Sequence, residues 1–123
     1  MISLSEAIVN AIRDGKKVLI CGNGGLAAES EHFEAELMGK YAFDVYVPCV
    51  ALTANSSLLT ALANDIGYEN VFSHQVSVLG NKGDILIGMT TSASKNILKA
   101  IEAGKKIGMV TFLLDRSVWA GND

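Results

Sequence analysis

The stretch from Val18 to Gly39 constrains the fold more than any other part of the sequence. An apolar run, Val18 to Cys21, meets a glycine-rich turn, Gly22 to Gly25, which is followed by helix formers from Leu26 to Met38. This order brings the unpaired N–H groups of a helix N-terminus to the end of a strand, where an anion can be held. The turn matches neither the P-loop nor the dinucleotide-binding glycine pattern, so alone it specifies no ligand.

Further apolar runs and helical patterns alternate along the rest of the chain. We expect strands at Lys17–Cys21, Val45–Leu52, Asp84–Met89 and Met109–Leu114. Pro48 predicts that the second strand starts irregularly or lies near a sheet edge. The expected helices are one capped by Ser5 and ended by Gly15, one from Ser56 or Ser57 to about Asn64, one over Glu69–Leu79, and one from Lys95 to Ala103 ended by Gly104. Repeated strand–helix units predict an α/β fold, a parallel sheet with helices on both faces.

Composition limits the classes of protein to which the chain can belong. Its 123 residues suit a single domain over 1–123, and the hydrophobic content of 50% with 19% charged residues argues against disorder. A net charge of -3 gives no footprint for direct binding of nucleic acid or an anionic membrane. No apolar run is long enough for a membrane span, and a cytoplasmic location is the default expectation. Cys21 and Cys49 lie in apolar runs and are interpreted as core residues.

Three expected loops follow the carboxyl ends of strands, the edge at which parallel sheets bind ligands. They are Gly22–Gly25, Thr53–Ser57 and Thr90–Ser94, and each is rich in glycine or hydroxyl groups. Hydroxyls and backbone N–H groups can hold a phosphate without a large positive charge. Each side chain taken singly could equally be an ordinary turn or cap residue, so the anion site is predicted from their joint placement.

His32 and Glu36 are one helical turn apart and admit several interpretations. The carboxylate could be a base that removes a proton next to a carbonyl, the pair could supply two ligands to a divalent metal, or it could be a surface ion pair near Glu29. His74 stands alone before the third strand and is interpreted as a surface or interfacial histidine.

Several segments together carry a family resemblance. CGNGG followed by AAESEHFEAEL, then VALTANSSLLTALANDIGYENVFSHQV, then GDILIGMTTSASKNILKAIEAGKKIGM, resemble the phosphoheptose isomerase group within the sugar isomerase (SIS) domain family. The resemblance runs from Val18 to about Leu113, with the segments in the family's order. It implies a three-layer α/β sandwich of the SIS, flavodoxin-like type, and a homo-oligomer, dimer or tetramer.

The resemblance also implies an activity and a set of site residues. Family members interconvert sedoheptulose 7-phosphate and a heptose 7-phosphate through an enediol, in carbohydrate metabolism that supplies lipopolysaccharide precursors. Glu36 occupies the place of the family's catalytic base, and His32 and Glu36 match positions that bind zinc in some members. The residues expected at the sugar phosphate are Asn23, Gly24, Gly25, Asn55, Thr90, Ser92 and Ser94.

The sequence departs from the family pattern at several positions. Leu26 stands where a serine usually follows the glycines, Asn55 where an acidic residue is common, and Lys40 and His74 where arginines are common. The phosphate loop, usually Ser-Thr-Ser-Gly-Asn-Ser, reads Thr90–Ser94 and then Lys95, interpreted as one residue shorter. The family's remaining catalytic histidine and a glutamine ligand belong to a C-terminal helix that this sequence is expected to lack.

These departures leave two hypotheses from different classes. The first is the sugar-phosphate-binding domain of a phosphoheptose isomerase, whose activity in this short chain is uncertain because acid–base chemistry needs both partners. The second is a non-catalytic SIS module that senses a sugar phosphate or acts as a scaffold for a partner of the replication-initiator type.

Overall fold

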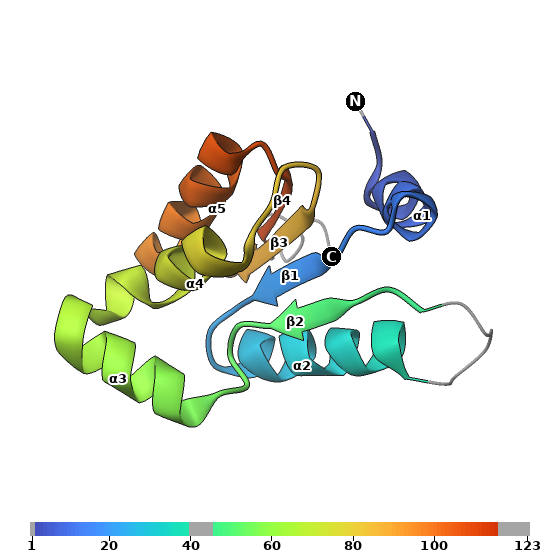
Figure 1. Cartoon of the computed structure of the whole chain (residues 1–123). Coiled ribbons are helices and arrows are strands. Elements are labelled where there is room, and N and C mark those ends of the chain that lie inside the picture. Colours follow the sequence, from blue (N-terminus) through green and yellow to red (C-terminus); the bar gives the residue numbers. More distant parts are fainter. Residues whose placement is uncertain (1, 40–45, 116–123) are drawn as a thin grey trace.

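The computed structural model describes residues 2–39 and 46–115 of the chain (Figure 1). Its helices and strands alternate as expected for repeated β–α units. In chain order the elements are α1 (Leu4–Asp14), β1 (Val18–Cys21), α2 (Gly25–Met38), β2 (Cys49–Ala51), α3 (Ser56–Ile66), the 3-10 turn η1 (Tyr68–Asn70), α4 (Val71–Leu79), β3 (Ile85–Thr90), α5 (Lys95–Ile107) and β4 (Val110–Asp115).

The strands form one parallel sheet in the order β2-β1-β3-β4. The register places Val18 of β1 beside Cys49 of β2 and beside Ile85 of β3. Among the described strands β2 is thus an edge strand, as Pro48 suggested, and its regular part begins only after that proline. Val45, the expected start of this strand, lies outside the described residues.

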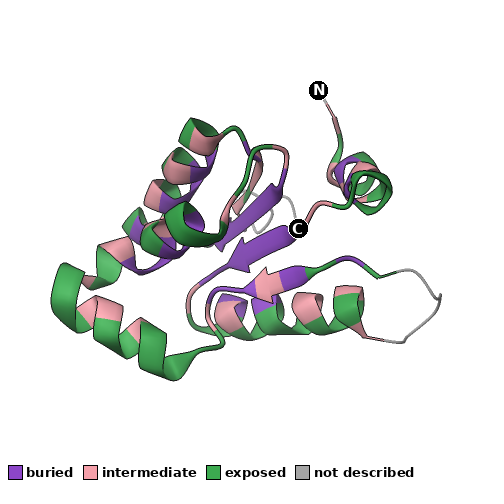
Figure 2. Ribbon diagram, in the orientation of Figure 1, coloured by how far each residue is buried: buried purple, intermediate pink, exposed green. Residues whose placement is uncertain are grey.

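Helices cover both faces of the sheet, which confirms the three-layer α/β sandwich. β1 is buried along its whole length, and Figure 2 shows the central strands as the most buried part of the ribbon. One apolar cluster packs α1 and α2 against one face, and a second packs α4 and α5 against the other. Alternate residues of one strand enter opposite clusters, as Ile20 and Leu19 do, because successive strand side chains point to opposite faces.

Cys21 and Cys49 are free and buried, as expected of core residues. They belong to the clusters on opposite faces of the sheet, so their side chains point away from each other. Burial raises the pKa of each thiol to about 12. Both cysteines are therefore unreactive core residues at neutral pH.

Several expected helix boundaries are wrong, and each has a local cause. The N-cap of α1 is Ser3, not Ser5, because the Ser3 hydroxyl accepts a hydrogen bond from the Glu6 amide at 3.1 Å. The segment from Glu69 begins as the 3-10 turn η1, and regular helix starts only at Val71. Gly104 does not end α5, which continues to Ile107 and ends at Gly108.

The reason for Gly104 is packing. A Cβ atom at this position would lie 2.8 Å from the Leu86 side chain, so the missing side chain lets α5 approach the sheet closely. Gly108, with φ 95°, is the residue that adopts the left-handed conformation typical of a helix end.

Across residues 2–39 and 46–115, no helix combines the length and the apolar character that crossing a lipid bilayer would demand.

Candidate functional site

The candidate site lies at the carboxyl edge of the sheet, where the chain leaves β1 and β3. The strands are parallel and so all end at this edge, and α2 runs back from it beside β2 (Figure 1). From β1 the chain passes to α2 on one face, whereas from β3 it passes to α5 on the other face. Such a reversal between adjacent strands opens a crevice, the usual ligand position in open α/β sheets.

The loop from Thr90 to Ser94 folds around the hydroxyl of Thr90. That hydroxyl oxygen accepts hydrogen bonds from the amides of Ser92 at 3.3 Å and Ser94 at 3.0 Å. It also donates to the Ser94 hydroxyl at 3.3 Å, and the hydroxyls of Ser92 and Ser94 lie 3.4 Å apart. Ser94 is the N-cap of α5. The structure thus gathers three hydroxyls at the start of a 13-residue helix, where the helix dipole favours an anion.

Ala93 adopts a backbone conformation in this loop that favours glycine. Its φ is 52°, and it is the one described residue other than glycine with a positive φ. Counted from Thr90 it is the fourth residue, the place of glycine in the pattern Ser-Thr-Ser-Gly-Asn-Ser. The first four residues of the loop thus follow that pattern, and the one-residue shortening expected after them stays a prediction.

The glycine turn after β1 requires glycine for two different reasons. Gly24 has φ 58° and ψ -121°, a combination that a residue with a Cβ atom rarely adopts. At Gly22 a Cβ atom would lie 2.7 Å from Cβ of Leu26. Leu26 itself is buried in the core cluster beneath α2, so its side chain serves packing. The turn leaves the first amides of α2, including that of Gly25, at the sheet edge.

Asn23 connects the glycine turn to the start of α5. Its Nδ2 donates to Oδ1 of Asn96 at 2.9 Å, and its Oδ1 accepts from Nδ2 of Asn96 at 3.0 Å. The hydroxyl of Tyr68 in η1 also donates to Oδ1 of Asn23, at 2.8 Å. The sequence reasoning missed Asn96 and Tyr68. One signal was available, because asparagine is a poor residue inside a helix unless its side chain has a partner.

The second loop, after β2, is held by carboxylates of α2. Glu34 accepts a hydrogen bond from the Ala51 amide at 2.7 Å, and Glu31 accepts one from the Thr53 hydroxyl at 2.8 Å. Asn55 is the N-cap of α3, since its Oδ1 accepts from the Leu58 amide at 3.0 Å. The expected caps at Ser56 or Ser57 are therefore wrong. The cap uses the side chain of Asn55, a residue expected at the sugar phosphate.

His32 and Glu36 lie near the other end of α2. Nε2 of His32 is 3.0 Å from Oε1 of Glu36, and their side chains are 71% and 51% exposed. Glu36 comes 11 residues after Gly25, which at the rise of an α-helix places it about 16 Å further along the axis. The structure therefore confirms the contact between the two side chains but does not bring Glu36 into the loop cluster of the same chain.

The pair does not by itself constitute a metal centre. Zinc in proteins is held by at least three side-chain ligands. Within the described ranges, no three His, Cys, Asp or Glu side chains are placed so that they could share an ion. His32 and Glu36 alone therefore do not fit a zinc site.

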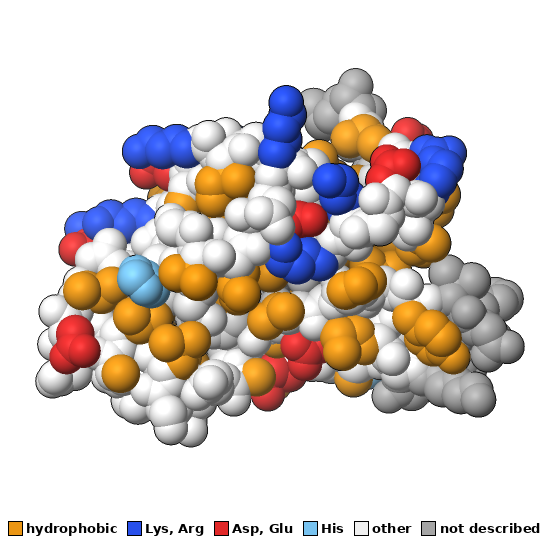
Figure 3. Space-filling view, in the orientation of Figure 1, with side chains coloured by type: hydrophobic (Ala, Val, Ile, Leu, Met, Phe, Trp, Pro, Cys, Tyr) orange, Lys and Arg blue, Asp and Glu red, His pale blue; other side chains and the backbone are white. Residues whose placement is uncertain are grey.

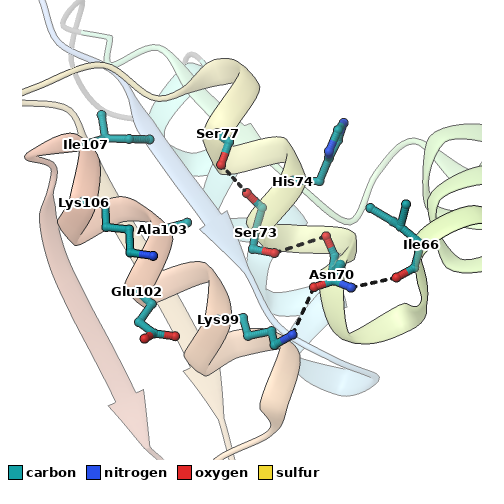
Figure 4. A pocket seen from close by; sticks show the side chains of 10 residues that line it. All are labelled: Ile66, Asn70, Ser73, His74, Ser77, Lys99, Glu102, Ala103, Lys106 and Ile107. Carbon is teal, nitrogen blue, oxygen red and sulfur yellow. Dashed lines mark hydrogen bonds between the residues drawn. The ribbon is translucent and has the colours of Figure 1, made fainter.

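A separate open groove of about 490 Å³ runs between α4 and α5 (Figure 4). Nζ of Lys99 lies 3.2 Å from Oδ1 of Asn70 across it, and the Ser73 and Ser77 hydroxyls donate to backbone carbonyls of their own helical segment. The exposed side chain of His74 lines this groove, which agrees with its interpretation as a surface histidine. Thr90, Ser92 and Ser94 are not among the residues that line this groove.

Comparison with known proteins gives a consistent result. Residues 1–114 match the family model described as "SIS domain". The chain is 47% identical over 111 residues to the phosphoheptose isomerase of Clostridium acetobutylicum, an alignment that covers 89% of this chain and 57% of the relative. It is 49% identical over 109 residues to that of Helicobacter pylori (strain P12), covering 87% of this chain and 57% of the relative.

Solved structures give the same picture. The phosphoheptose isomerase from Neisseria gonorrhoeae superposes with a TM-score of 0.81 at 39% identity, over 89% of this chain and 57% of that one. The phosphoheptose isomerase from Francisella tularensis gives a TM-score of 0.82 at 37% identity, over 90% and 58% of the two chains. The sequence thus spans a little more than half the length of these relatives.

Proposed function

The chain belongs to the SIS domain family, and from that premise we propose that it binds a sugar phosphate between β1 and β3 as part of a phosphoheptose isomerase. The hydroxyl loop of Thr90, Ser92 and Ser94 at the start of α5 carries the proposal. Support also comes from two relatives that are named phosphoheptose isomerase and are 47% and 49% identical in sequence to this chain. We found no feature of the described residues that favours a scaffold.

The phosphate of the sugar is proposed to lie against the N-terminus of α5. Ser92 and Ser94 would donate from their hydroxyls, and the free amides of the helix's first turn would donate from the backbone. Asn23, Gly24 and Gly25 across the crevice would bound the sugar through the turn backbone. The cap role of Asn55 leaves its Nδ2 group as the part able to reach a ligand.

Glu36 is the proposed base. In an aldose–ketose exchange a base removes a proton from the hydroxyl-bearing carbon beside the carbonyl while the carbonyl oxygen gains a proton, which gives an enediol. The other enediol hydroxyl then loses its proton to become the new carbonyl, and the former carbonyl carbon gains a proton. An ionised carboxylate can take the first proton when one of its oxygens lies within hydrogen-bonding distance of the carbon that carries the proton. No step of this proposal uses zinc, because the described residues supply only His32 and Glu36 as ligands.

The distance along α2 makes assembly part of the proposal. Because Glu36 lies about 16 Å beyond the glycine turn, we propose that a homo-oligomer, dimer or tetramer, brings Glu36 of one copy near the loops of another. Apolar surface is available for such contacts, since Val9 of α1 is 59% exposed and Val78 of α4 is 70% exposed. Hydrophobic side chains also gather across the middle of the face in Figure 3.

The test separates binding from chemistry. Thermal unfolding of the chain is followed with sedoheptulose 7-phosphate, with the sugar lacking its phosphate, and with inorganic phosphate. Ligand at one hundred times its Kd should stabilise the fold by about 2.7 kcal/mol. The double variant Ser92→Ala/Ser94→Ala should lose this shift, whereas Ser77→Ala, a serine of α4 outside the loop, should keep it.

Exchange of a sugar proton in D₂O reports on the base. Glu36→Gln should keep ligand binding and lose deuterium incorporation into the sugar. The proposal fails if millimolar sedoheptulose 7-phosphate gives no stabilisation, or if Glu36→Gln exchanges as fast as the wild-type chain.

A further inference from the structure

We propose that Asn96, with Tyr68, is a positioning residue that holds the glycine turn at a fixed distance from the phosphate loop through the side chain of Asn23. This inference rests on the proposed function, because it assigns a role in sugar-phosphate binding to residues that do not touch the ligand. The three side chains are called the asparagine clasp below.

The clasp spans the crevice between the two central strands. Asn23 follows β1 and Asn96 lies in the first turn of α5, just after the hydroxyl loop that follows β3. The two amides exchange hydrogen bonds of 2.9 and 3.0 Å. These residues are 73 positions apart in the sequence. A reciprocal amide pair fixes both the separation and the relative orientation of the segments that carry it.

Burial makes this pair hard to replace by water. Asn96 is only 4% exposed, and its side chain has no described use other than the bonds to Asn23. A buried amide that loses its partner costs free energy, so the chain keeps the two loops together to satisfy it. Tyr68 adds a bond of 2.8 Å from η1 to the same oxygen of Asn23, so a third segment fixes the turn.

The clasp changes what Asn23 itself can do. Its Oδ1 already accepts two hydrogen bonds, which are the two lone pairs of an amide oxygen, and one hydrogen of its Nδ2 is used. The side chain is therefore committed to holding the turn. What the turn offers to a ligand is its backbone, in particular the amides that Gly24 and Gly25 place at the start of α2.

The test compares the wild-type chain with Asn96→Ala and Asn96→Asp. Asn96→Asp keeps the shape of the side chain but places a carboxylate oxygen opposite Oδ1 of Asn23. If Asn96 served packing alone, this substitution would leave exchange and binding unchanged. Asn64→Ala is the control, since Asn64 is an exposed residue of α3 whose side chain bonds only its neighbour Asp65. Hydrogen–deuterium exchange without ligand and the Kd for sedoheptulose 7-phosphate are measured for each.

Both Asn96 variants should speed exchange in the peptide covering residues 22–26, on the far side of the crevice, and should weaken sugar-phosphate binding at least 10-fold. Exchange in α1 should stay as in the wild-type chain. Unchanged exchange at residues 22–26 overturns the clasp, and faster exchange with an unchanged Kd overturns its positioning role. If the wild-type chain binds no sugar phosphate, the proposed function falls and the positioning role with it, while the exchange data still decide whether the clasp joins the loops.

Discussion

Asp84 joins β1 to β3 at the edge of the sheet opposite the candidate site, and its removal gives the sharpest test of what stabilises this fold. Asp84 is only 3% exposed and immediately precedes β3. It accepts hydrogen bonds from Nζ of Lys17 at 2.6 Å, from the Lys17 amide at 3.2 Å and from the Asn81 amide at 2.9 Å. Asp84→Asn keeps the shape and removes the charge.

The expected cost follows from these contacts. Hydrogen bonds to a charged group contribute about 1.5–3 kcal/mol, and removing one partner of a buried ion pair costs about 3–5 kcal/mol. The Lys17 side chain is 24% exposed, so its ammonium can turn towards water once Asp84 is neutral. We therefore expect Asp84→Asn to lower the free energy of unfolding by about 2–3 kcal/mol at pH 7, and Tm by roughly 10 °C.

The dependence on pH distinguishes the charge from the shape. Burial alone would raise the pKa of Asp84, but the hydrogen bonds and charge of Lys17 and the Asn81 amide outweigh it and lower the pKa below 3.8. A group whose pKa is lowered by folding stabilises the folded state above its unfolded pKa, and that stability is lost as the pH falls through the folded value. The difference between the wild-type chain and Asp84→Asn should thus be full at pH 7 and shrink as the pH falls below about 3.8.

Equilibrium urea unfolding at pH 7, 5, 4 and 3.5 measures this difference directly. The matched control is Asp14→Asn, because Asp14 is exposed and its contact with Arg13 is long, at 4.0 Å. Exposed pairs of this kind contribute less than about 1 kcal/mol. A loss below 1 kcal/mol for Asp84→Asn at pH 7, or a loss that does not change with pH, would refute the reasoning.

Two backbone positions give further predictions. Ala93→Gly should raise stability by about 0.5–1 kcal/mol, because relief of a positive φ of 52° outweighs the greater freedom of glycine in the unfolded chain; a lower Tm in a thermal melt would contradict this. Gly88→Ala should cost about 1–3 kcal/mol, because the new Cβ atom would lie 2.9 Å from Cγ2 of Ile97 in a closely packed core. An unchanged urea midpoint for Gly88→Ala would show that α5 can move away from β3.

The sequence predicted the layers and the order of elements well, because both follow from the hydrophobic pattern within each segment. A strand covered on both faces needs an unbroken apolar run, so the runs around Leu19 and Leu86 marked the sheet without ambiguity. The proline before β2 predicted a strand that starts irregularly or lies near an edge for an equally local reason, and β2 does both. These predictions depend on nothing beyond the segment concerned and its periodicity.

Predictions failed where a residue's role depends on a distant neighbour. A glycine at position 104 is typical of a helix end. Its actual role is to let α5 pack closely against Leu86, a contact that exists only in the folded chain. Asn96 reads as an ordinary polar residue until Asn23 lies opposite it. The hydroxyl loop could be placed at a strand end from sequence. Its closure around Thr90 goes together with a positive φ at Ala93, and an alanine in the sequence does not indicate that conformation.

Distance along α2 is the point at which sequence reasoning and structure differ most in consequence. In the sequence the glycine turn and the pair His32/Glu36 form one short stretch and read as one site. In a helix each residue advances the chain by about 1.5 Å, so the stretch separates its two ends by far more than a side chain can reach. Under the proposed function, a heptose phosphate bound at the start of α5 would meet the turn backbone in its own chain, whereas Glu36 would come from another copy in an assembly. Binding and proton transfer are then separable properties, and a monomeric form of this chain should bind the phosphate without exchanging the sugar proton.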